Sequence, residues 1–529
     1  MGYRVVWFKR DLRVQDHWPL QEAARHGPVL CLYVVEPGLW AQPDAAAQHY
    51  GFVRESLQAL DAQLRALGSR LHVAVGEVVD VLAALHAAAP FEAVHAHEET
   101  GNAWTYARDL AVGRWCRAHG VGWQEWPQFG VLRRLRDRRE WQPHWERHMG
   151  AAQALTPGGL QAPALRQAHG CPVWPWGSRP LPGAAELGLD PFEPPRRQRG
   201  GRHRAEAVLL DFLHDRSAHY RGGISSPLSA PEACSRLSPY LAHGCLSMRE
   251  VVQATRHQLA ALSPADKRQR LGLQGFVSRL YWHCHFIQKL ESEPELEWRN
   301  LHRGYDGLRE ADWNPAHFEA LQQGRTGWPM VDACVAMLRE TGWLNFRMRA
   351  MLVSVAAYPL WLHWQPVGHW LARQFLDYEP GIHWPQMQMQ SGTTGINTTR
   401  VYNPVKQAMD HDPQGHFVRQ WLPALRRVPD SWLFEPWRMS ADLQARCGVR
   451  VGEDLAMPPV ELMDALRISK TRMHALRRQP AVRAAKAAVV ERHGSRRGMP
   501  GASRDARGEE RPAARRQAAP PKNQMTLDF

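Results

Sequence analysis

The sequence lacks any run of about 18 or more apolar residues, which is the length that a membrane-spanning helix needs. Its opening residues, MGYRVVWFKRDLRV, carry charges where a signal peptide has an apolar core. The eight cysteines are scattered and form no C-x-x-C pair, so we expect buried free thiols rather than disulfides or an iron–sulfur cluster. These absences favour a cytoplasmic protein, which we expect to be a monomer.

Acidic side chains are also in deficit. Lys and Arg number 66 against 52 Asp and Glu, which gives a formal net charge of +14. Such an excess favours a polyanionic partner, because binding releases the counterions condensed on that partner. Part of this positive charge is concentrated in residues 483–522, which are dense in arginine. Those arginines form either part of a binding surface or a solvated arm that binds nothing.

A chain of 529 residues exceeds what one hydrophobic core usually supports, so we expect two or three domains. The first part of the chain alternates a helical pattern at 48–67 with short apolar runs, which lie at 3–8, 29–35, 71–75 and 93–97. Buried strands that alternate with helices predict a doubly wound parallel sheet, and we place this α/β domain at residues 1–133.

The periodicity fades over residues 134–201, where Pro, Gly and Arg accumulate, and this predicts an interdomain linker. Residues 202–485 should form an all-α domain, because helical patterns recur there at 205–219, 248–262, 271–290, 329–340 and 344–357. Residues 486–529 contain few large apolar side chains before the last six residues. We expect this segment to be a disordered basic tail.

Several motifs recur in order along the chain. They are WFKRDLR at 7–13, CSRLSPYL at 234–241, GRTGWP at 324–329, GWLNFRMR at 342–349, RVYNP at 400–404 and EPW at 435–437. In this order they resemble the photolyase/cryptochrome family of light-driven flavoproteins, in a divergent, bacterial-type form. The resemblance implies that the helical domain holds FAD.

The candidate phosphate site is the second of these motifs. Small hydroxyls at a helix start, here Ser235 and Ser238, can bind a diphosphate together with free backbone N–H groups. The resemblance places the FAD phosphates on this segment, which includes Leu237. It further assigns to the cofactor pocket Tyr220, Arg279 and Asn345, the last where some relatives carry a lesion-contacting His or Asn.

Arg349 and Asp377 resemble the arginine and aspartate that flank the isoalloxazine ring, and Glu379 occupies a second acidic position. An arginine stabilises negative charge near N1 of a reduced flavin, while carboxylates hold N3–H. Because Arg349 lies in a strongly apolar helical pattern, we expect it to be buried and paired.

His383 stands where the resemblance implies a residue opposite flavin N5, a position usually held by Asn in photolyases and by Asp or Cys in many cryptochromes. A histidine there can act as a proton donor or as a hydrogen-bond partner. A shift of one residue in the correspondence would place Trp384 there instead.

Family members carry electrons to the flavin along a row of tryptophans. Trp364 matches the middle member, whereas Met387 occupies the position of the flavin-proximal one. We therefore predict a rerouted chain, with His383, Trp364 and Met387 as the catalytic candidates and Trp313, Trp361 and Trp370 as unassigned alternatives.

The expected DNA side also departs from the family. Relatives that repair cyclobutane dimers carry Glu and Trp where Gly275 and Ser278 stand, and Trp282, His283 and His285 are candidate replacements. No metal site is predicted, because His283, Cys284 and His285 would face different sides of a helix. The predicted DNA contacts are Trp282, Arg347, Gln388, Met389, Arg400 and Lys406.

The last six residues, QMTLDF, place Gln524 before apolar side chains at Met525, Leu527 and Phe529. They resemble the short peptide by which bacterial repair and replication proteins dock on the sliding clamp. A position at the end of a disordered arm suits such a tether.

The resemblance implies light-dependent repair, in which reduced FAD donates an electron to a UV-induced pyrimidine dimer, as in a deoxyribodipyrimidine photolyase. The alternatives are a cryptochrome-like blue-light photoreceptor without repair activity and an FAD module without light chemistry. Cyclobutane and (6-4) lesions both remain open. The strand ends near His97, Glu98, Glu99 and Trp104 are a candidate binding site for an antenna chromophore, either folate or deazaflavin. The alternative is that this domain binds no chromophore.

Overall fold

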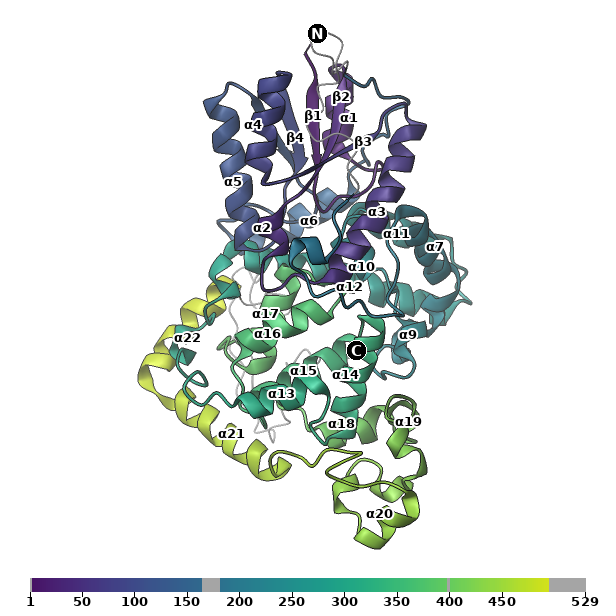
Figure 1. The fold of residues 1–529 in the computed structure, drawn as a ribbon, viewed down its shortest axis with the longest axis vertical. Coiled ribbons are helices and arrows are strands. Elements are labelled where there is room, and N and C mark those ends of the chain that lie inside the picture. Colours follow the sequence, from purple (N-terminus) through teal and green to yellow (C-terminus); the bar gives the residue numbers. More distant parts are fainter. Residues whose placement is uncertain (1, 164–180, 397–399, 494–529) are drawn as a thin grey trace, which may run out of the picture.

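The computed structural model describes residues 2–163, 181–396 and 400–493. In this part of the chain an α/β domain sits on a larger helical domain (Figure 1). The predicted fold class is therefore confirmed. Of the tail predicted at residues 486–529, the first part lies in the last helix, which ends at His493, and residues 494–529, with the clamp-like peptide, lie outside the described residues.

Five parallel strands form one sheet within the described α/β domain, in the order β3-β2-β1-β4-β5. Their bounds are β1 Arg4–Phe8, β2 Val29–Val35, β3 Leu71–Val75, β4 Ala93–His97 and β5 Gly122–Trp126. The register of β1 runs from Arg4↔Val29 to Phe8↔Tyr33 against β2, and from Arg4↔Ala93 to Val6↔His95 against β4. The apolar runs predicted the first four strands, but β5 was missed because its sequence, GWQEW, is a polar edge strand without a fully buried residue.

Helices cover both faces of this sheet (Figure 1). On one face α1 (Trp18–Arg25) and α3 (Ala47–Ala66) bury Leu20 and Leu57 against the β1 side chains Val6 and Phe8. On the other face α4 (Val78–Ala88) and α5 (Ala103–Ala118) pack on Val5 and Trp7, the alternate residues of β1. Each such aliphatic side chain contributes roughly 1.5–3 kcal/mol by leaving water. A short helix, α2 (Pro37–Trp40), follows β2.

The remaining described helices, together with one π-helical turn, make up the second domain and its connection. They are α6 Trp141–Gly150, α7 Arg202–Asp211, the π turn Phe212–Arg216, α8 Ser217–Gly223, α9 Ala230–Ala233, α10 Ser238–Ala242, α11 Met248–Ala261, α12 Lys267–Ser292, α13 Pro315–Gln323, α14 Pro329–Thr341, α15 Phe346–Ala357, α16 Trp364–Gln374, α17 Pro380–Ser391, α18 Pro404–His411, α19 His416–Trp421, α20 Ala441–Cys447, α21 Leu462–Arg478 and α22 Pro480–His493. The predicted domain end at residue 485 falls inside α22.

Proline and glycine set the ends of the helices that matter most here. Pro329 and Pro380 occupy the first turns of α14 and α17, where a missing N–H costs nothing. Gly342 and Gly392 end the same two helices at φ 65° and 78°, a left-handed backbone that favours glycine. Helix α17 packs against α12, α15 and α16, so its side chains lie at the centre of the helical domain.

The opening motif joins the two domains. Arg10, just after β1, donates hydrogen bonds from Nε to the carbonyl of Ala242 and from Nη2 to Glu379 Oε2, the latter 2.8 Å long. Asp16, in the α/β domain, accepts a further interdomain hydrogen bond of 2.7 Å from Nη1 of Arg249 in α11. None of the helices in the described chain combines the length and apolarity needed to cross a bilayer.

Candidate functional site

A large cavity opens inside the helical domain, and we call it the central cavity. It encloses about 1540 Å³ of open space, its mouth included, between α8, the start of α10, α12, α15 and α17. The predicted site residues that line it are Tyr220, Ser235, Ser238, Arg279, Trp282, Arg349, Asp377, Glu379, His383 and Met387. Segments more than 150 residues apart in sequence therefore converge on one space.

Arg349 and Asp377 form a two-pronged ion pair in which Asp377 is buried and the Arg349 side chain is 21% exposed. Nη1 donates to Oδ1 and Nη2 donates to Oδ2, each over 2.9 Å, and Arg349 Nε donates to the carbonyl of Leu344. Burial alone would raise the pKa of Asp377, but the charge of Arg349 and hydrogen bonds from Arg349 and Ser238 hold it below its ordinary value. The pair thus presents a fixed cation with its counterion to the cavity.

Glu379 is oriented by the α/β domain. Its Oε2 accepts the hydrogen bond from Arg10, and its Oε1 accepts one from the backbone N–H of Gly381 in the first turn of α17. Burial raises the pKa of this carboxyl, while the charge of Arg10 works in the opposite direction. Glu379 therefore couples the opening motif to the cavity wall.

The predicted phosphate segment contains a cation that sequence reasoning overlooked. Arg236, between Ser235 and Ser238, lines the cavity with a left-handed backbone at φ 61°, and its guanidinium lies 3.9 Å over the ring of Trp343. Burial lowers the pKa of Arg236 to about 10, so it stays charged at neutral pH. The position of Arg236 inside the motif, between the two serines, could have identified it as a candidate phosphate ligand.

His383 is held in one tautomer. Its Nε2 lies 2.9 Å from the carbonyl oxygen of Gly368, which can only accept, so Nε2 carries the proton and Nδ1 bears a lone pair. Burial lowers the pKa of His383 to about 3, which keeps the ring neutral. His383 lines the cavity, and Trp384 lies behind it with the two rings 5.0 Å apart.

The register of α17 decides which of its residues reach the cavity. The lining positions are 379, 382, 383, 386, 387 and 390, the steps of three and four that one helix face provides. Gln388 points elsewhere: it accepts from the N–H of Leu301 at 2.6 Å and donates to the carbonyl of Leu296 at 2.8 Å. Both Gln388 and Met389 are buried away from the cavity lining, so the structure gives them packing contacts instead of the predicted DNA contacts.

The same face of α17 carries two side-chain amides, Gln386 and Gln390, each with one polar atom that makes no hydrogen bond within the described structure. Gln390 Nε2 donates to Gln386 Oε1 over 3.1 Å, and both side chains line the cavity. Gln386 Nε2 and Gln390 Oε1 are buried and have no protein partner. A buried polar group without a partner is costly, so these two atoms indicate a ligand edge that offers an acceptor beside a donor.

Five other predicted contacts lie outside the lining. Leu237 and Asn345 are both 1% exposed, and Asn345 Nδ2 donates to the carbonyls of Ile224 and Ser225. Arg400 is half-buried, with its carbonyl oxygen accepting from Ser354 Oγ. Lys406 is exposed and pairs with Asp410 one helical turn away. Arg347 is half-buried on α15 and its charge lowers the pKa of the neighbouring His411, after the larger effect of burial.

Two tryptophan rings stand next to each other behind the cavity wall. The ring centroids of Trp364 and Trp384 are 5.9 Å apart, and Trp364 Nε1 donates to Asn300 Oδ1 at 2.8 Å. Met387 lines the cavity at 2% exposure and contributes no ring. Trp361 lies near the surface, where its ring is flanked by Arg309 and Arg472 at 4.7 and 5.0 Å.

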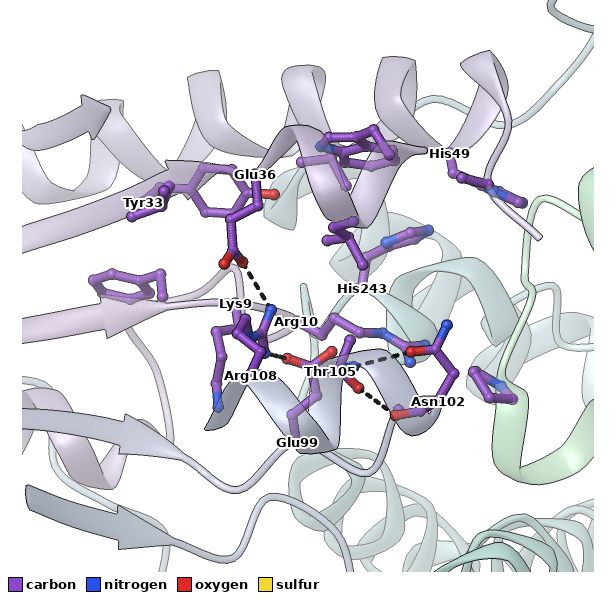
Figure 2. Close-up of a pocket in the computed structure, with 18 of the residues that line it drawn as sticks. Lys9, Arg10, Tyr33, Glu36, His49, Glu99, Asn102, Thr105, Arg108 and His243 are labelled. Atoms are coloured by element: carbon purple, nitrogen blue, oxygen red, sulfur yellow. Dashed lines mark hydrogen bonds and ion pairs between the residues drawn. The ribbon is translucent and has the colours of Figure 1, made fainter. Parts of the chain in front are cut away.

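A second cavity, here named the interface cavity, lies between the two domains and holds about 800 Å³ of open space. It opens at the carboxyl ends of β1, β2 and β4, where the strand order reverses and α/β sheets usually bind ligands. Figure 2 shows Arg108 between Glu36 and Glu99 in this cavity, with a 2.9 Å bond to Glu36. Burial raises the pKa of Glu36 to about 7 against the effect of Arg108.

The four sequence-predicted antenna residues differ in position. Glu99 lines the interface cavity, and the Trp104 ring lies 5.6 Å from the Arg108 guanidinium. Glu98 lies near Arg133, and burial raises its pKa to about 7. His97 points instead into a buried cluster with Asp11.

That cluster has the composition of a metal site but the bonding of a hydrogen-bond network. Asp11, His17 and His97 offer ligand atoms within 4.8 Å of one another. Asp11 Oδ2 accepts from His17 Nε2 at 2.9 Å and from His97 Nδ1 at 2.7 Å, while His17 Nδ1 accepts from the N–H of Leu20. Because Nδ1 is used as an acceptor, the His17 proton must sit on Nε2, where a metal would have to bind.

Comparison with known proteins agrees with this geometry. Residues 4–131 match the family model described as DNA photolyase, and residues 276–475 match the FAD binding domain of DNA photolyase. The chain is 28% identical over 87% of its length to a cryptochrome DASH of Gloeobacter violaceus, covering 93% of it. It is 27% identical over 88% of its length to a deoxyribodipyrimidine photo-lyase of Escherichia coli, covering 97% of it.

Solved structures share the fold. A bacterial class III photolyase of Agrobacterium tumefaciens superimposes with a TM-score of 0.75 at 24% identity, over 90% of this chain and 98% of that one. A cryptochrome of Synechocystis gives 0.77 at 22% identity, over 89% and 98%. The chain belongs to the photolyase/cryptochrome family and carries its FAD-binding domain.

Proposed function

We propose that the protein is a light-dependent DNA repair enzyme of the deoxyribodipyrimidine photolyase type, with FAD and a UV-induced pyrimidine dimer side by side in the central cavity. Curated relatives named as photolyases support the reaction class. The unpaired atoms of Gln386 and Gln390 are the observation that carries the substrate half of the proposal.

The donor set of the central cavity suits FAD, which when bound in reduced form supplies the electron for dimer cleavage after absorbing blue light. Arg349 stabilises negative charge on a reduced ring, and Asp377 holds the guanidinium in place. Arg236 and Arg279 provide cations for a diphosphate. His383 offers a lone pair at Nδ1, and so serves as a hydrogen-bond acceptor instead of a proton donor.

The remaining wall suits a flat base with a polar edge. Trp282, Phe286 and Met387 provide aromatic and apolar surface, on which a flipped-out pyrimidine can pack. Beside them, Gln386 and Gln390 leave one donor and one acceptor, which match the O4 and N3–H of a thymine. Reversing both amides again leaves one donor and one acceptor, so the match does not depend on which atom is nitrogen.

A photoreceptor function is the second candidate. Gly275 and Ser278 stand where dimer-repairing relatives carry Glu and Trp. A Cβ atom at position 275 would lie 3.6 Å from the ring of Tyr220, an ordinary van der Waals contact, so glycine leaves the Tyr220 ring uncovered on this side. Curated relatives include a cryptochrome DASH and a plant cryptochrome, so a role without repair has support in the same family.

Dark binding separates the two candidates. The FAD-loaded protein should bind an oligonucleotide with one thymine dimer more tightly than the undamaged strand. The double variant Gln386→Leu, Gln390→Leu should lose about tenfold or more of that preference and keep its FAD. Gln153→Leu, at an exposed surface amide, is the matched control. Equal affinity of the wild type for damaged and undamaged DNA would reject the repair proposal in favour of the photoreceptor.

The sliding clamp is proposed as a protein partner. The support is the sequence of Gln524, Met525, Leu527 and Phe529, which lie outside the described residues. Deletion of residues 524–529 should abolish retention on immobilised bacterial clamp and leave DNA binding unchanged. Undiminished retention of the truncated chain would remove this partner.

A second chromophore is proposed for the interface cavity. The support is the position of this cavity at the carboxyl ends of the strands and its aromatic and charged lining. A photolyase structure from Sulfolobus tokodaii, which shares this fold at a TM-score of 0.69, is described with two FAD molecules. Extraction of the purified holoprotein should release a second chromophore besides FAD; release of FAD alone at one equivalent would oppose this assignment.

A further inference from the structure

Tyr378 forms part of the wall between the two cavities, because it lines both of them. It lies in the turn between α16 and α17, one residue after Asp377. Its ring packs at 5.2 Å from the ring of His383 on the central side, and at 6.1 Å from that of His49 on the interface side. A single aromatic side chain thus reaches from the proposed flavin position to the other cavity.

The hydroxyl of Tyr378 is bonded to a buried carboxylate. It donates to Asp44 Oδ2 over 2.6 Å, and the same oxygen accepts from Asn102 Nδ2 at 3.2 Å. Asp44 is 5% exposed and lines the interface cavity. Burial raises the pKa of Tyr378 well above its ordinary value, so the neutral phenol keeps its proton. A phenol that loses an electron becomes a strong acid, and an adjacent carboxylate is then a suitable proton acceptor.

The two tryptophans behind the cavity wall, Trp364 and Trp384, lack such an acceptor among the described residues. Trp364 donates to the amide oxygen of Asn300, and the Trp384 side chain lies against the Tyr378 hydroxyl; neither group is a base. Trp361 does donate to Asp312, but it does not line the central cavity. The cations of Arg309 and Arg472 over its ring oppose the loss of an electron there.

We propose that Tyr378 is a redox-active residue, which gives one electron to a light-excited oxidised flavin in the central cavity while its phenolic proton passes to Asp44. The O–H bond of Tyr378 breaks and an O–H bond forms on Asp44 Oδ2. The flavin gains one electron, and a neutral tyrosyl radical remains. A thiolate in solution then supplies one electron and becomes a thiyl radical, and the proton returns from Asp44 to the Tyr378 oxygen. The step rests on FAD in the central cavity and does not require repair.

Light-induced radicals test this step directly. The oxidised FAD-loaded protein is illuminated with a thiol present, and the radicals are followed by transient absorption and by electron paramagnetic resonance of frozen samples. The wild type should give a tyrosyl radical, which forms more slowly in D2O because a proton moves with the electron. Tyr378→Phe should lower the radical yield and the rate of flavin reduction by about tenfold or more. Tyr358→Phe, which removes a buried hydroxyl without a partner in the described structure, should change neither.

Asp44→Asn provides a second variant that retains the phenol and removes the base. It should slow tyrosyl formation and reduce the D2O effect, even where Tyr378→Phe has lost its FAD. An unchanged tyrosyl signal in Tyr378→Phe, or a tryptophan radical in the wild type that disappears in Trp384→Phe, would overturn the proposal. Repair by the chemically reduced wild-type protein does not use this step, so a failure of repair is distinguishable from a failure of the Tyr378 step.

Discussion

Arg349 and Asp377 face each other through two parallel hydrogen bonds of 2.9 Å, at the point where α15 meets the turn before α17. Both line the central cavity, and Arg349 also lies 4.2 Å over the ring of Phe375. The pair therefore stabilises the fold and also holds a cation beside the proposed position of the flavin ring.

Arg349→Gln should release FAD and destabilise the protein, because it leaves the Asp377 carboxylate buried without its counter-charge. Removing one partner of a buried ion pair costs about 3–5 kcal/mol. The ratio of flavin absorbance to protein absorbance after gel filtration measures retention. Arg467→Gln, which breaks the exposed pair with Asp464, is the matched control and should keep its FAD. Full retention by Arg349→Gln would contradict the assigned role.

His383 should remain neutral, with its proton on Nε2, from pH 8 down to pH 5. Burial lowers its pKa to about 3, and the bond to Gly368 fixes the tautomer. Nitrogen-15 NMR of histidine-labelled protein can report the protonation of each ring nitrogen, with His383→Ala identifying the signal. A His383 signal that titrates near pH 6.5, or one with its proton on Nδ1, would show that the acceptor assignment is wrong.

Buried neutral histidines should make the protein sensitive to acid. Burial lowers the pKa of His95 to about 4, below its ordinary value of 6.5, so the unfolded chain binds a proton in this interval that the folded chain does not. The free energy of unfolding should therefore fall as the pH drops from about 6.5 to 4, by about 1.4 kcal/mol per pH unit for this residue.

Urea unfolding of His95→Phe measures that contribution. The phenyl ring retains the stacking on Trp126 and removes a group whose two nitrogens lack partners in the described structure. The variant should lose stability less steeply between pH 6.5 and 4 than the wild type does. Identical slopes for the two proteins would mean that His95 is not held neutral in the fold.

Met387→Trp should speed light-driven flavin reduction, because it adds a ring at the cavity wall near the Trp364–Trp384 pair. The larger side chain has open space on one side, so its cost should stay near the low end of the roughly 1–3 kcal/mol typical of overpacking. The rate of flavin reduction is measured from the flavin absorbance during illumination in the presence of a thiol. An unchanged rate would show that electrons do not reach the flavin by way of position 387.

The sequence predicted those parts of the molecule that depend on periodicity and on local motifs. The apolar runs predicted four strands of the sheet, and Tyr220, Arg349 and Asp377, which the family resemblance assigned to the cofactor, do line one cavity. Gln388 was misplaced although the steps of three and four from His383 already lead to Gln386, Met387 and Gln390. A helical register applied from His383 would have corrected it.

Other features depend on tertiary contacts that no local pattern contains. Tyr378 and Asp44 are separated by 334 residues, and only the docking of the two domains brings the hydroxyl to the carboxylate. The link from Arg10 to Glu379 has the same origin. Which nitrogen of His383 carries the proton follows from the carbonyl of Gly368, 15 residues earlier, whose position is set by the packing of α16 on α17.

The most direct test of the proposed function is the fate of a pyrimidine dimer in light. The reduced, FAD-loaded protein is mixed with oligonucleotides that contain one cyclobutane or one (6-4) dimer, in single and double strands, and lesions are counted by chromatography after blue illumination or darkness. The account predicts loss of one lesion type in the light and none in the dark. Persistence of both lesions in the illuminated samples, with FAD bound and reduced, would contradict it.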